Sequence, residues 1–361
     1  MDLVVRGTVI VDAERTLPQV GVSGESLVLD GGGGAEQVIE GWVLPGLVDV
    51  HCHIGLGSEG PVDAETALTQ GQADLAAGTL LVRDAGVPVD TRWLEGRTDV
   101  PEIIRSGRHL ARPKRYLRYY ADELGSVADL PGAMAAQARA GDGWVKVVGD
   151  WIDRDRADQA DLAPLWPRTE LTEGVRRAHA EGARVTVHTF ATETIDDLLA
   201  AGVDCIEHGT GMNAEQIQIA AERAIPVVPT LLQVGQFDQF AEQGAAKFPL
   251  YAKRMRDMHA RRYQQVRALH EAGVPLLVGS DAGGLLEHGR IAAECAEMVR
   301  AGVPVIDVLA AASWAARDYL GRPGIVEGAP ADLVVYPEDP RRDIGVLAHP
   351  SAVIRRGHVV A

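Results

Sequence analysis

The sequence predicts an α/β protein: a (β/α)8 TIM barrel with a small β-sandwich domain formed from both termini. One reason is a recurring unit, in which a helix-like stretch is followed by Ala-Gly or Glu-Gly and a short apolar run. A second is that eight apolar runs of strand length alternate with helix-like stretches, as βαβ units require. A third is that both ends of the chain instead contain short strand-like runs and glycine turns.

The recurring unit is centred on four glycines, Gly78, Gly182, Gly202 and Gly273. A glycine in this place is typical of the residue that stops a helix. The strand that follows is short and apolar on both faces, which is typical of a buried parallel strand. Each of these strands ends in a polar residue, and the four are Asp84, His188, His208 and Asp281.

The eight predicted strands are 46–53, 79–84, 102–106, 144–149, 184–188, 203–207, 226–231 and 275–280. A barrel of this kind carries its chemistry at the C-terminal ends of the strands. A doubly wound open sheet is the competing α/β architecture. It requires a glycine-rich phosphate turn after the first strand, and residues 51–57 (HCHIGLG) do not fit that fingerprint.

The two ends of the chain are expected to pair with each other. Strand-like runs and a glycine turn at Gly31 to Gly34 fill the N-terminal end, and similar runs fill the C-terminal end. We therefore assign residues 1–44 and 325–361 to the small β domain and residues 45–324 to the barrel.

Composition narrows the class of function. The 361 residues are 46% hydrophobic and carry a formal net charge of −16, which disfavours nucleic acid and anionic membranes as partners. No run approaches the roughly 20 apolar residues of a membrane span, and the N-terminus does not read as a signal peptide. Three cysteines are typical of reduced thiols rather than a disulfide framework. We expect a cytoplasmic protein acting on a small molecule, with a homo-oligomer left open.

Polar residues inside or at the ends of the predicted strands point to a metal centre. They are His51, His53, Lys146, His188, His208 and Asp281. An unpaired polar group in an apolar layer costs several kcal/mol, and a shared metal would satisfy all of them. His51 and His53 lie two residues apart, so both imidazoles lie on one face of a strand. Lys146 is one of only four lysines in an arginine-rich chain, which suggests a role that arginine cannot fill.

The order of the motifs resembles the amidohydrolase superfamily. Residues 41–53 (GWVLPGLVDVHCH) are similar to its opening signature. The segments 82–86 (VRDAG), 185–188 (VTVH), 206–209 (IEHG), 279–281 (GSD) and 328–335 (GAPADLVV) then follow in the family's order. The strand 144–148 (WVKVV) resembles that of the binuclear, prolidase-like and imidazolonepropionase-related branch.

The resemblance implies two divalent metal ions, with zinc expected. His51, His53 and Asp281 would bind one ion, His188 and His208 would bind the second, and a carboxylated Lys146 would bridge them. The chemistry is reasonable because burial lowers a lysine's pKa and a neutral amine can capture CO₂. The competing interpretation is a buried lysine paired with Asp281 or Asp49 and no second metal.

The resemblance implies a hydrolase that cleaves an amide-type C–N bond, peptide-like, N-acyl or cyclic, with metal-bound hydroxide. Asp281 would take a proton from the water and pass it to the leaving amine. One alternative is a mononuclear relative, an imidazolone hydrolase or a deaminase, that uses His51, His53, His188 and Asp281. Ala191 counts against deamination, since the zinc deaminases often have Glu there. A non-catalytic family member is the other alternative, although the chain keeps the full ligand set.

Substrate recognition is where the resemblance is weakest. Dipeptidase-like relatives carry Gly-Gly-His after the third strand, whereas residues 106–109 here read SGRH. The candidate substrate-binding residues follow the predicted strands: Arg118, Tyr119, Tyr120, Trp151, Phe190, Gln233 and His288. His109 is expected to be a surface or packing residue.

Overall fold

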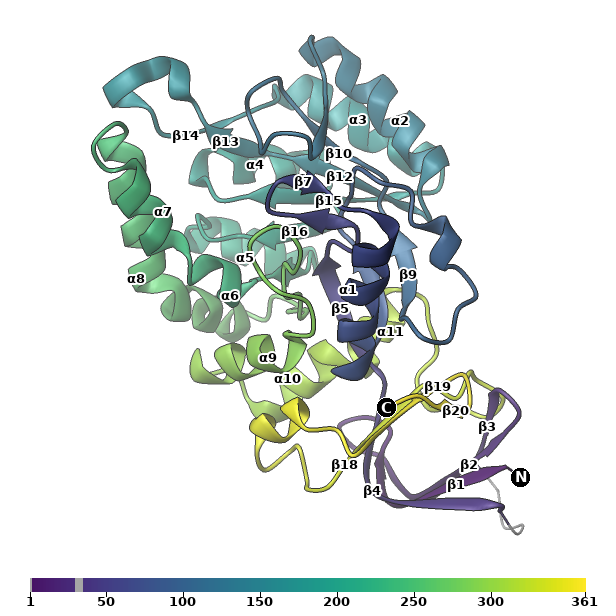
Figure 1. Ribbon diagram of the computed structural model, residues 1–361. Coiled ribbons are helices and arrows are strands. Elements are labelled where there is room, and N and C mark those ends of the chain that lie inside the picture. Colours follow the sequence, from purple (N-terminus) through teal and green to yellow (C-terminus); the bar gives the residue numbers. More distant parts are fainter. Residues whose placement is uncertain (1, 30–34) are drawn as a thin grey trace.

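The computed structural model describes residues 2–29 and 35–361 and has a mixed α/β fold (Figure 1). The predicted turn at Gly31 to Gly34 lies outside the described residues. Four strands precede the α/β part: β1 (Leu3–Ile10), β2 (Thr16–Ser23), β3 (Ser26–Val28) and β4 (Gln37–Pro45). Three strands follow it: β18 (Leu333–Tyr336), β19 (Ala352–Arg355) and β20 (His358–Val359).

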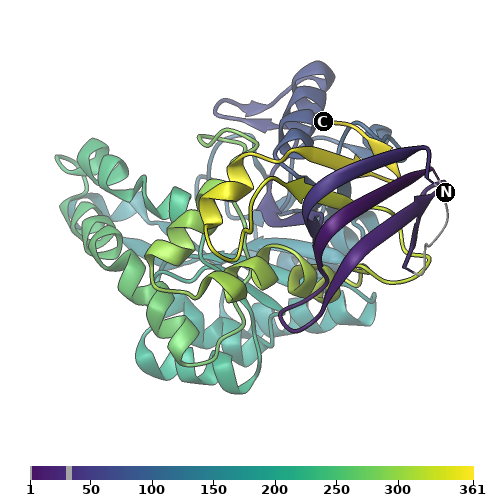
Figure 2. The ribbon, with the colours of Figure 1, turned by 90° about the horizontal axis from the view of Figure 1, so that it is seen from below.

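Strands from the two ends of the chain form one seven-stranded sheet in the order β20-β19-β18-β4-β1-β2-β3. The junction is the antiparallel pairing of β18 with β4, in which Leu333 lies opposite Pro45. Figure 2 shows these first and last strands side by side, and in Figure 1 they lie below the α/β part. Apolar side chains from both ends, among them Val5, Val22 and Leu333, share one buried cluster on this sheet. A sandwich of two sheets and the exact domain boundaries stay predictions.

The α/β part contains two parallel sheets. One has the order β5-β8-β9 and the other β11-β10-β12-β15-β16-β17. The strands of the first are β5 (Leu47–Cys52), β8 (Thr79–Asp84) and β9 (Glu102–Arg105). Those of the second are β10 (His109–Ala111), β11 (Ala121–Glu123), β12 (Trp144–Val148), β15 (Arg184–Thr189), β16 (Cys205–His208) and β17 (Val227–Val228). Seven of the eight predicted segments therefore contain a parallel strand.

The eighth predicted strand, 275–280, does not form a continuous strand. Leu276 makes an isolated parallel bridge to Val227, and the backbone N–H of Val50 donates to the carbonyl of Val278 at 3.0 Å. The segment thus lies between β17 and β5 and joins the two sheets through scattered hydrogen bonds. Pro275 has no N–H to donate, which contributes to the irregular ladder. Gly279 is needed here because a Cβ would lie 2.5 Å from the Cβ of His51.

Helices and small hairpins fill the connections. The helices are α1 (Ala64–Ala76), α2 (Leu130–Ala140), α3 (Arg168–Ala180), α4 (Thr192–Ala201), α5 (Ala214–Glu222), α6 (Leu231–Val234), α7 (Phe237–Gly244), α8 (Pro249–Glu271), α9 (Ile291–Arg300), α10 (Val305–Ala312) and α11 (Trp314–Tyr319). The hairpins are β6 (Leu56–Gly57) with β7 (Gly60–Pro61), and β13 (Asp150–Ile152) with β14 (Leu162–Pro164). Short 3-10 helices cover Arg92–Leu94, Val127–Asp129, Arg154–Gln159 and Ile344–Ala348. Among the described residues, no helix has both the length and the apolar character needed to cross a membrane.

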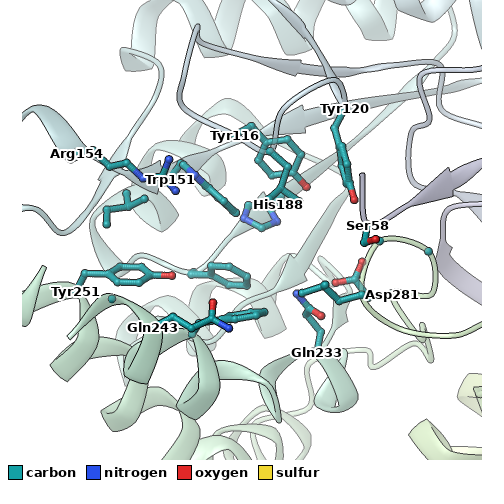
Figure 3. Close-up of a pocket in the computed structure, with 18 of the residues that line it drawn as sticks. Ser58, Tyr116, Tyr120, Trp151, Arg154, His188, Gln233, Gln243, Tyr251 and Asp281 are labelled. Carbon is teal, nitrogen blue, oxygen red and sulfur yellow. The ribbon is translucent and has the colours of Figure 1, made fainter. Parts of the chain in front are cut away.

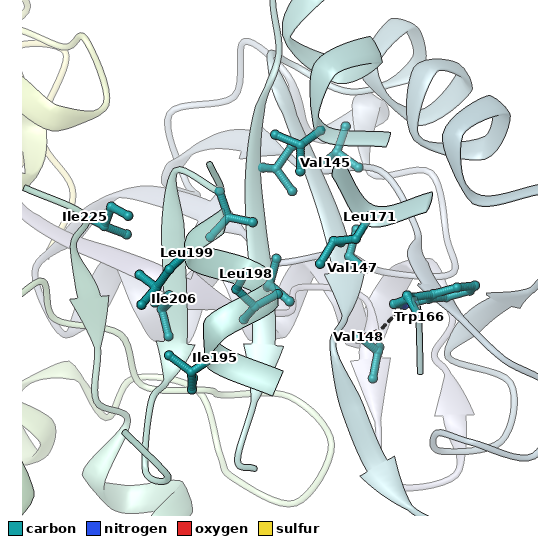
Figure 4. Close-up of a cluster of buried hydrophobic side chains, with 14 of the residues drawn as sticks. Val145, Val147, Val148, Trp166, Leu171, Ile195, Leu198, Leu199, Ile206 and Ile225 are labelled. Atoms are coloured by element: carbon teal, nitrogen blue, oxygen red, sulfur yellow. Dashed lines mark hydrogen bonds between the residues drawn. The ribbon is translucent and has the colours of Figure 1, made fainter. Parts of the chain in front are cut away.

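The largest apolar cluster lies between the second sheet and helices α2 to α5. Val145 and Val147 of β12 meet Leu171 of α3 and Leu198 of α4 there (Figure 4). Strands that are apolar on both faces, as the sequence predicts, are buried because helices cover them. A second cluster combines residues of both sheets with α11.

Truncating the α4 side of this core should cost much of the protein's stability. Leu198 is fully buried, so Leu198→Ala should lower the free energy of unfolding by about 2–5 kcal/mol. Leu250→Ala on α8 is the matched control, because 41% of that side chain is exposed and its loss should cost less than about 1 kcal/mol. Urea unfolding of both variants measures the difference, and equal losses would contradict the assignment of Leu198 to the core.

Candidate metal centre and its pocket

The first group of candidate ligands lies where β5 ends. His51 is in β5 and His53 just beyond it, and both Nε2 atoms lie 3.1 Å from Oδ1 of Asp281. Nδ1 of His53 lies 2.8 Å from the carbonyl oxygen of Gly86, which can only accept, so this nitrogen is the one that carries hydrogen. That leaves the Nε2 lone pair of His53 directed at the centre, as metal-ligating histidines require.

The second group lies at the ends of β15 and β16. Nε2 of His208 is 2.9 Å from Nδ1 of His188, and the ring centroids of His208 and His51 are 5.1 Å apart. The Thr230 hydroxyl donates to the carbonyl of Pro229 at 2.9 Å and accepts from Nδ1 of His208 at 2.7 Å. Thr230 therefore fixes the tautomer of His208 in which Nδ1 carries the hydrogen, and the Nε2 lone pair faces Nδ1 of His188.

The backbone is strained at these ligands. His208 and Asp281 have φ values of +63° and +56°, and Thr230 has +47°. Side chains other than glycine rarely adopt the left-handed region, and such strain collects at functional sites. Glu207 faces the site, so in a regular strand the next side chain, His208, would face away from it. The left-handed backbone at His208 changes the chain direction and lets its imidazole reach the site as well.

Lys146 lies mid-strand in β12 and is completely buried. Its Nζ contacts Oε2 of Glu207, whose other oxygen accepts from the Thr186 hydroxyl at 2.6 Å. Arg83 lies 3.6 Å from the same carboxylate. The competing interpretation paired an unmodified Lys146 with Asp281 or Asp49. That prediction of the partner was wrong, because the carboxylate beside Lys146 is that of Glu207. Asp49 instead accepts hydrogen bonds from Ser280 and from the backbone N–H of His51.

The donor set fits metal ions. The imidazole nitrogens His51 Nδ1 and His188 Nε2 are buried and, among the described residues, have no hydrogen-bond partner. Ligand atoms of His51, His53 and Asp281 lie within 4.8 Å of one another, and so do those of His51, Glu207 and His208. Burial lowers the pKa values of His51, His188 and His208, so these imidazoles are neutral, the form that binds a metal.

A cavity of about 490 Å³ opens onto this centre. Figure 3 shows Asp281 and Ser58 at one end, His188 in the middle, and Arg154 with Tyr251 at the other end. Of the predicted substrate-binding residues, Tyr120, Trp151, Phe190 and Gln233 line the cavity.

Arg118, Tyr119 and His288 are not among the residues that line it. The Tyr119 side chain is 71% exposed and its backbone is left-handed, with φ +67°. His288 is held elsewhere, with its Nδ1 2.8 Å from Oδ2 of Asp74 on α1. A role for these three residues in binding substrate stays a prediction.

The family model of the amidohydrolase family matches residues 42–360 of the chain. The chain belongs to the amidohydrolase family. An uncharacterised protein of Mycobacterium tuberculosis is 51% identical over 325 residues, which are 90% of this chain and 87% of that protein. The ochratoxinase of Aspergillus niger is 27% identical over 235 residues, 63% of this chain and 47% of that enzyme.

Solved structures share the fold of this amidohydrolase-family chain. A Xaa-Pro dipeptidase with methionine bound in its active site superposes with a TM-score of 0.83, at 22% identity and 99% coverage of both chains. The crystal structure of the A. niger ochratoxinase gives a TM-score of 0.81 at 18% identity, covering 99% of this chain and 95% of that one.

Sequence reasoning missed two residues of the centre. Glu207 was read only as part of a motif, although its carboxylate contacts Lys146. His109 was expected at the surface or in packing; it is a packing residue, fully buried, but the contact its ring makes with the candidate ligand His53, with centroids 5.2 Å apart, was not foreseen. Neither ring nitrogen of His109 has a partner among the described residues. A charged residue next to a strand-end His was the available signal for Glu207; nothing comparable marked His109.

The His288–Asp74 pair anchors the loop that carries Gly283 to Leu285 into the cavity wall. Asp74 also accepts from the backbone N–H of Gly289 at 2.7 Å. Burial lowers the pKa of His288, but the Asp74 carboxylate outweighs this and raises the pKa above its ordinary 6.5. The pair therefore stabilises the fold fully below pH 6.5 and loses strength as the pH rises through the raised value.

Asp74→Asn should thus destabilise the protein more at pH 6 than at pH 9. The expected loss of unfolding free energy at pH 6 is about 3 kcal/mol, because a buried pair loses one partner. Asp307→Asn breaks the more exposed pair with His270 and should cost less than about 1 kcal/mol at either pH. Urea unfolding at the two pH values measures both variants, and a pH-independent loss in Asp74→Asn would contradict the ion pair.

Proposed function

We propose that this member of the amidohydrolase family is a metal-dependent hydrolase of amide-type C–N bonds in peptide-like, N-acyl or cyclic substrates. The observation that carries the proposal is the convergence of four histidines and Asp281 on one buried centre at the floor of a cavity. His51 Nε2 and His53 Nε2 both lie 3.1 Å from Asp281, and His188 lies 2.9 Å from His208. Small-molecule hydrolases in the family, such as the ochratoxinase, support the reaction class.

We further propose that the two parallel sheets close into the (β/α)8 barrel. Hydrogen bonds from Leu277 to Val227 and from Val50 to Val278 bridge one seam between them. Side chains from both sheets also meet in one apolar cluster, which includes Val50, Leu81, Trp144, Cys205 and Val228. An interior filled by side chains from strands on all sides is what a closed barrel requires.

His51, His53 and Asp281 would hold one divalent ion and His188 with His208 a second, with zinc as the expected metal. Lys146 in carboxylated form would bridge the two. When bound, such ions polarise an amide carbonyl and lower the pKa of water, so that hydroxide is available near neutral pH. Asp281 would accept the water proton at its carboxylate and deliver it to the leaving nitrogen. Thr230 and Gly86 hold the imidazoles of His208 and His53 in the tautomers that this requires.

Metal content and a hydrolysis screen test the proposal. Protein purified without chelators should contain about two ions per chain by elemental analysis, and chelation followed by zinc addition should abolish and restore activity. The screen covers N-acyl amino acids, dipeptides, lactams and imidazolones. A value near one ion in fully active protein would indicate the mononuclear alternative. A fully loaded protein that cleaves none of these amides would indicate a non-catalytic family member.

A further inference from the structure

The cavity above the metal centre has a composition unlike the rest of the molecule. The aromatic residues that line it are Tyr116, Tyr120, Trp151, Phe190, Phe240, Phe248 and Tyr251. Only 5% of the chain is Phe, Trp or Tyr, so aromatic residues are much more frequent in the cavity lining than in the chain as a whole. Flat aromatic walls bind flat apolar groups by area and by offset or edge-to-face contacts. A volume of about 490 Å³ is in the range of pockets that hold drug-sized molecules.

The charge of the cavity also differs in sign from that of the protein. The chain has a formal net charge of −16, yet within the described ranges 2–29 and 35–361 Asp281 is the only carboxylate that lines the cavity. Arg154 and Lys247 line it too. Neither forms an ion pair with a carboxylate within the described part of the chain, whereas nearby Lys253 and Arg254 both do. Two unpaired cations at an aromatic cavity in an acidic protein favour an anionic ligand.

Arg154 lies away from the reacting end of the cavity. In Figure 3, Arg154 lies with Tyr251 at the end of the cavity opposite Asp281. Lys247 precedes α8 by two residues, and its Nζ lies 5.2 Å from the ring centroid of Phe248. Along the cavity, Arg154 therefore lies opposite Asp281, with Trp151 and His188 between them.

The two walls are tied together. One wall comes from β13 and the 3-10 helix Arg154–Gln159, and the other from α7, α8 and the turn between them. Arg254 of α8 donates to Asp161 at 2.9 Å, beside the first wall, and to Glu193 of α4 at 2.8 Å. A pocket whose walls are held at a fixed separation is preorganised and favours a ligand of fixed thickness.

From these observations we propose that the substrate is an amide bearing a planar, bulky aromatic group with a carboxylate at the end remote from the scissile bond. The aromatic group lies between the Trp151 and Phe248 walls, and Arg154 with Lys247 binds the carboxylate. This inference rests on the proposed function for the identity of the scissile bond, but the binding subsite is testable without catalysis.

The test is a binding cycle with two ligands that the enzyme cannot hydrolyse, 2,6-naphthalenedicarboxylate and 2-naphthoate. Zinc-loaded protein should bind the dicarboxylate about tenfold more tightly by calorimetry, since the second carboxylate gains a charge-assisted contact. The double variant Arg154→Met/Lys247→Met should lose this advantage while binding 2-naphthoate nearly as before. Raising the salt from about 50 to about 500 mM should shrink the advantage in the wild type, because the cations are partly exposed.

The matched control is Arg156→Met/Lys253→Met, which removes one arginine from the same 3-10 helix and one lysine from α8, both outside the cavity lining. It should keep the full advantage of the dicarboxylate. Trp151→Leu should weaken both ligands by roughly tenfold through lost aromatic contact. Equal binding of the two ligands by the wild type, or an advantage that persists in Arg154→Met/Lys247→Met, would overturn the proposal.

Hydrolysis is a separate test. The matched amides 6-(methylcarbamoyl)-2-naphthoate and N-methyl-2-naphthamide carry the same scissile bond with and without the remote carboxylate. The carboxylate-bearing amide should have the higher kcat/KM, and equal values would count against the subsite. Failure of the whole amide screen would overturn the proposed function, whereas the binding cycle would still report on the subsite by itself.

Discussion

Lys146→Arg should abolish hydrolysis and lower the metal content below two ions per chain. Arginine keeps a positive charge beside Glu207, so the buried carboxylate retains a partner and the fold should survive. A guanidinium stays protonated and cannot capture CO₂, so no bridging oxygen ligand can form. Elemental analysis and the hydrolysis assay measure the two losses. Lys253→Arg, at an exposed lysine paired with Asp257, is the control and should change neither.

Lys146→Ala extends the same test. Removing the side chain leaves Glu207 with the Thr186 hydroxyl and the more distant Arg83 and His51, at 3.6 and 3.7 Å, so some stability should be lost as well. Short carboxylic acids should restore part of the activity by occupying the place of the carbamate. A ¹³C resonance from ¹³CO₂-treated wild-type protein that is absent in Lys146→Arg would identify the modification directly. Two fully occupied metals beside an unmodified Lys146 amine would contradict it.

Asp281→Asn should reduce turnover by roughly 10² to 10⁴, the usual contribution of general acid–base catalysis. Asparagine has nearly the same shape and keeps one oxygen toward His51 and His53, so most of the metal should remain bound. Burial acts to raise the pKa of Asp281, but the neighbouring His51 outweighs it and holds the pKa well below the ordinary value. The carboxylate is therefore ionised in the metal-free protein and available to accept a proton.

The readout for Asp281 includes the pH–rate profile. Its acidic limb should report the metal-bound water and Asp281 titrating together, and Asp281→Asn should move it. Asp332→Asn is the control, because it removes a buried carboxylate paired with Arg355 in the terminal sheet and should leave the profile unchanged. Near-normal turnover of Asp281→Asn with intact metal would make Asp281 a ligand or a cap only.

Local patterns explain why so much of the fold was predictable. Gly78, Gly182, Gly202 and Gly273 all have left-handed backbones, with φ between +77° and +86°, and helices end at or within two residues before them. Runs that are apolar on both faces became buried parallel strands because helices cover them. The segment 275–280 failed as a strand because neighbouring backbones at Val227 and Val50 bond it only at intervals, which no local pattern can reveal.

The residues of the candidate site likewise fall into those that local patterns predicted and those that they did not. A strand-end residue is visible in the sequence, so His51, His53, His188, His208 and Asp281 could all be named in advance. Glu207 was missed, although a charge beside a strand-end His was a signal, because strict alternation along β16 would send adjacent residues to opposite faces. The left-handed turn at His208, φ +63°, lets both side chains reach the centre. For this reason the predicted ion-pair partner of Lys146 was wrong.

What the sequence determined by itself is the order of elements and the identity of the candidate ligands, because both follow from periodicity and from the position of polar residues in apolar runs. Tertiary structure alone decided which side chains meet across strands: Glu207 with Lys146, His109 with His53, and His288 with Asp74. It also placed Arg154 and Lys247, which are far apart in the chain, at one aromatic cavity. Such contacts depend on how separate segments pack in space, and no local pattern of residues encodes that packing.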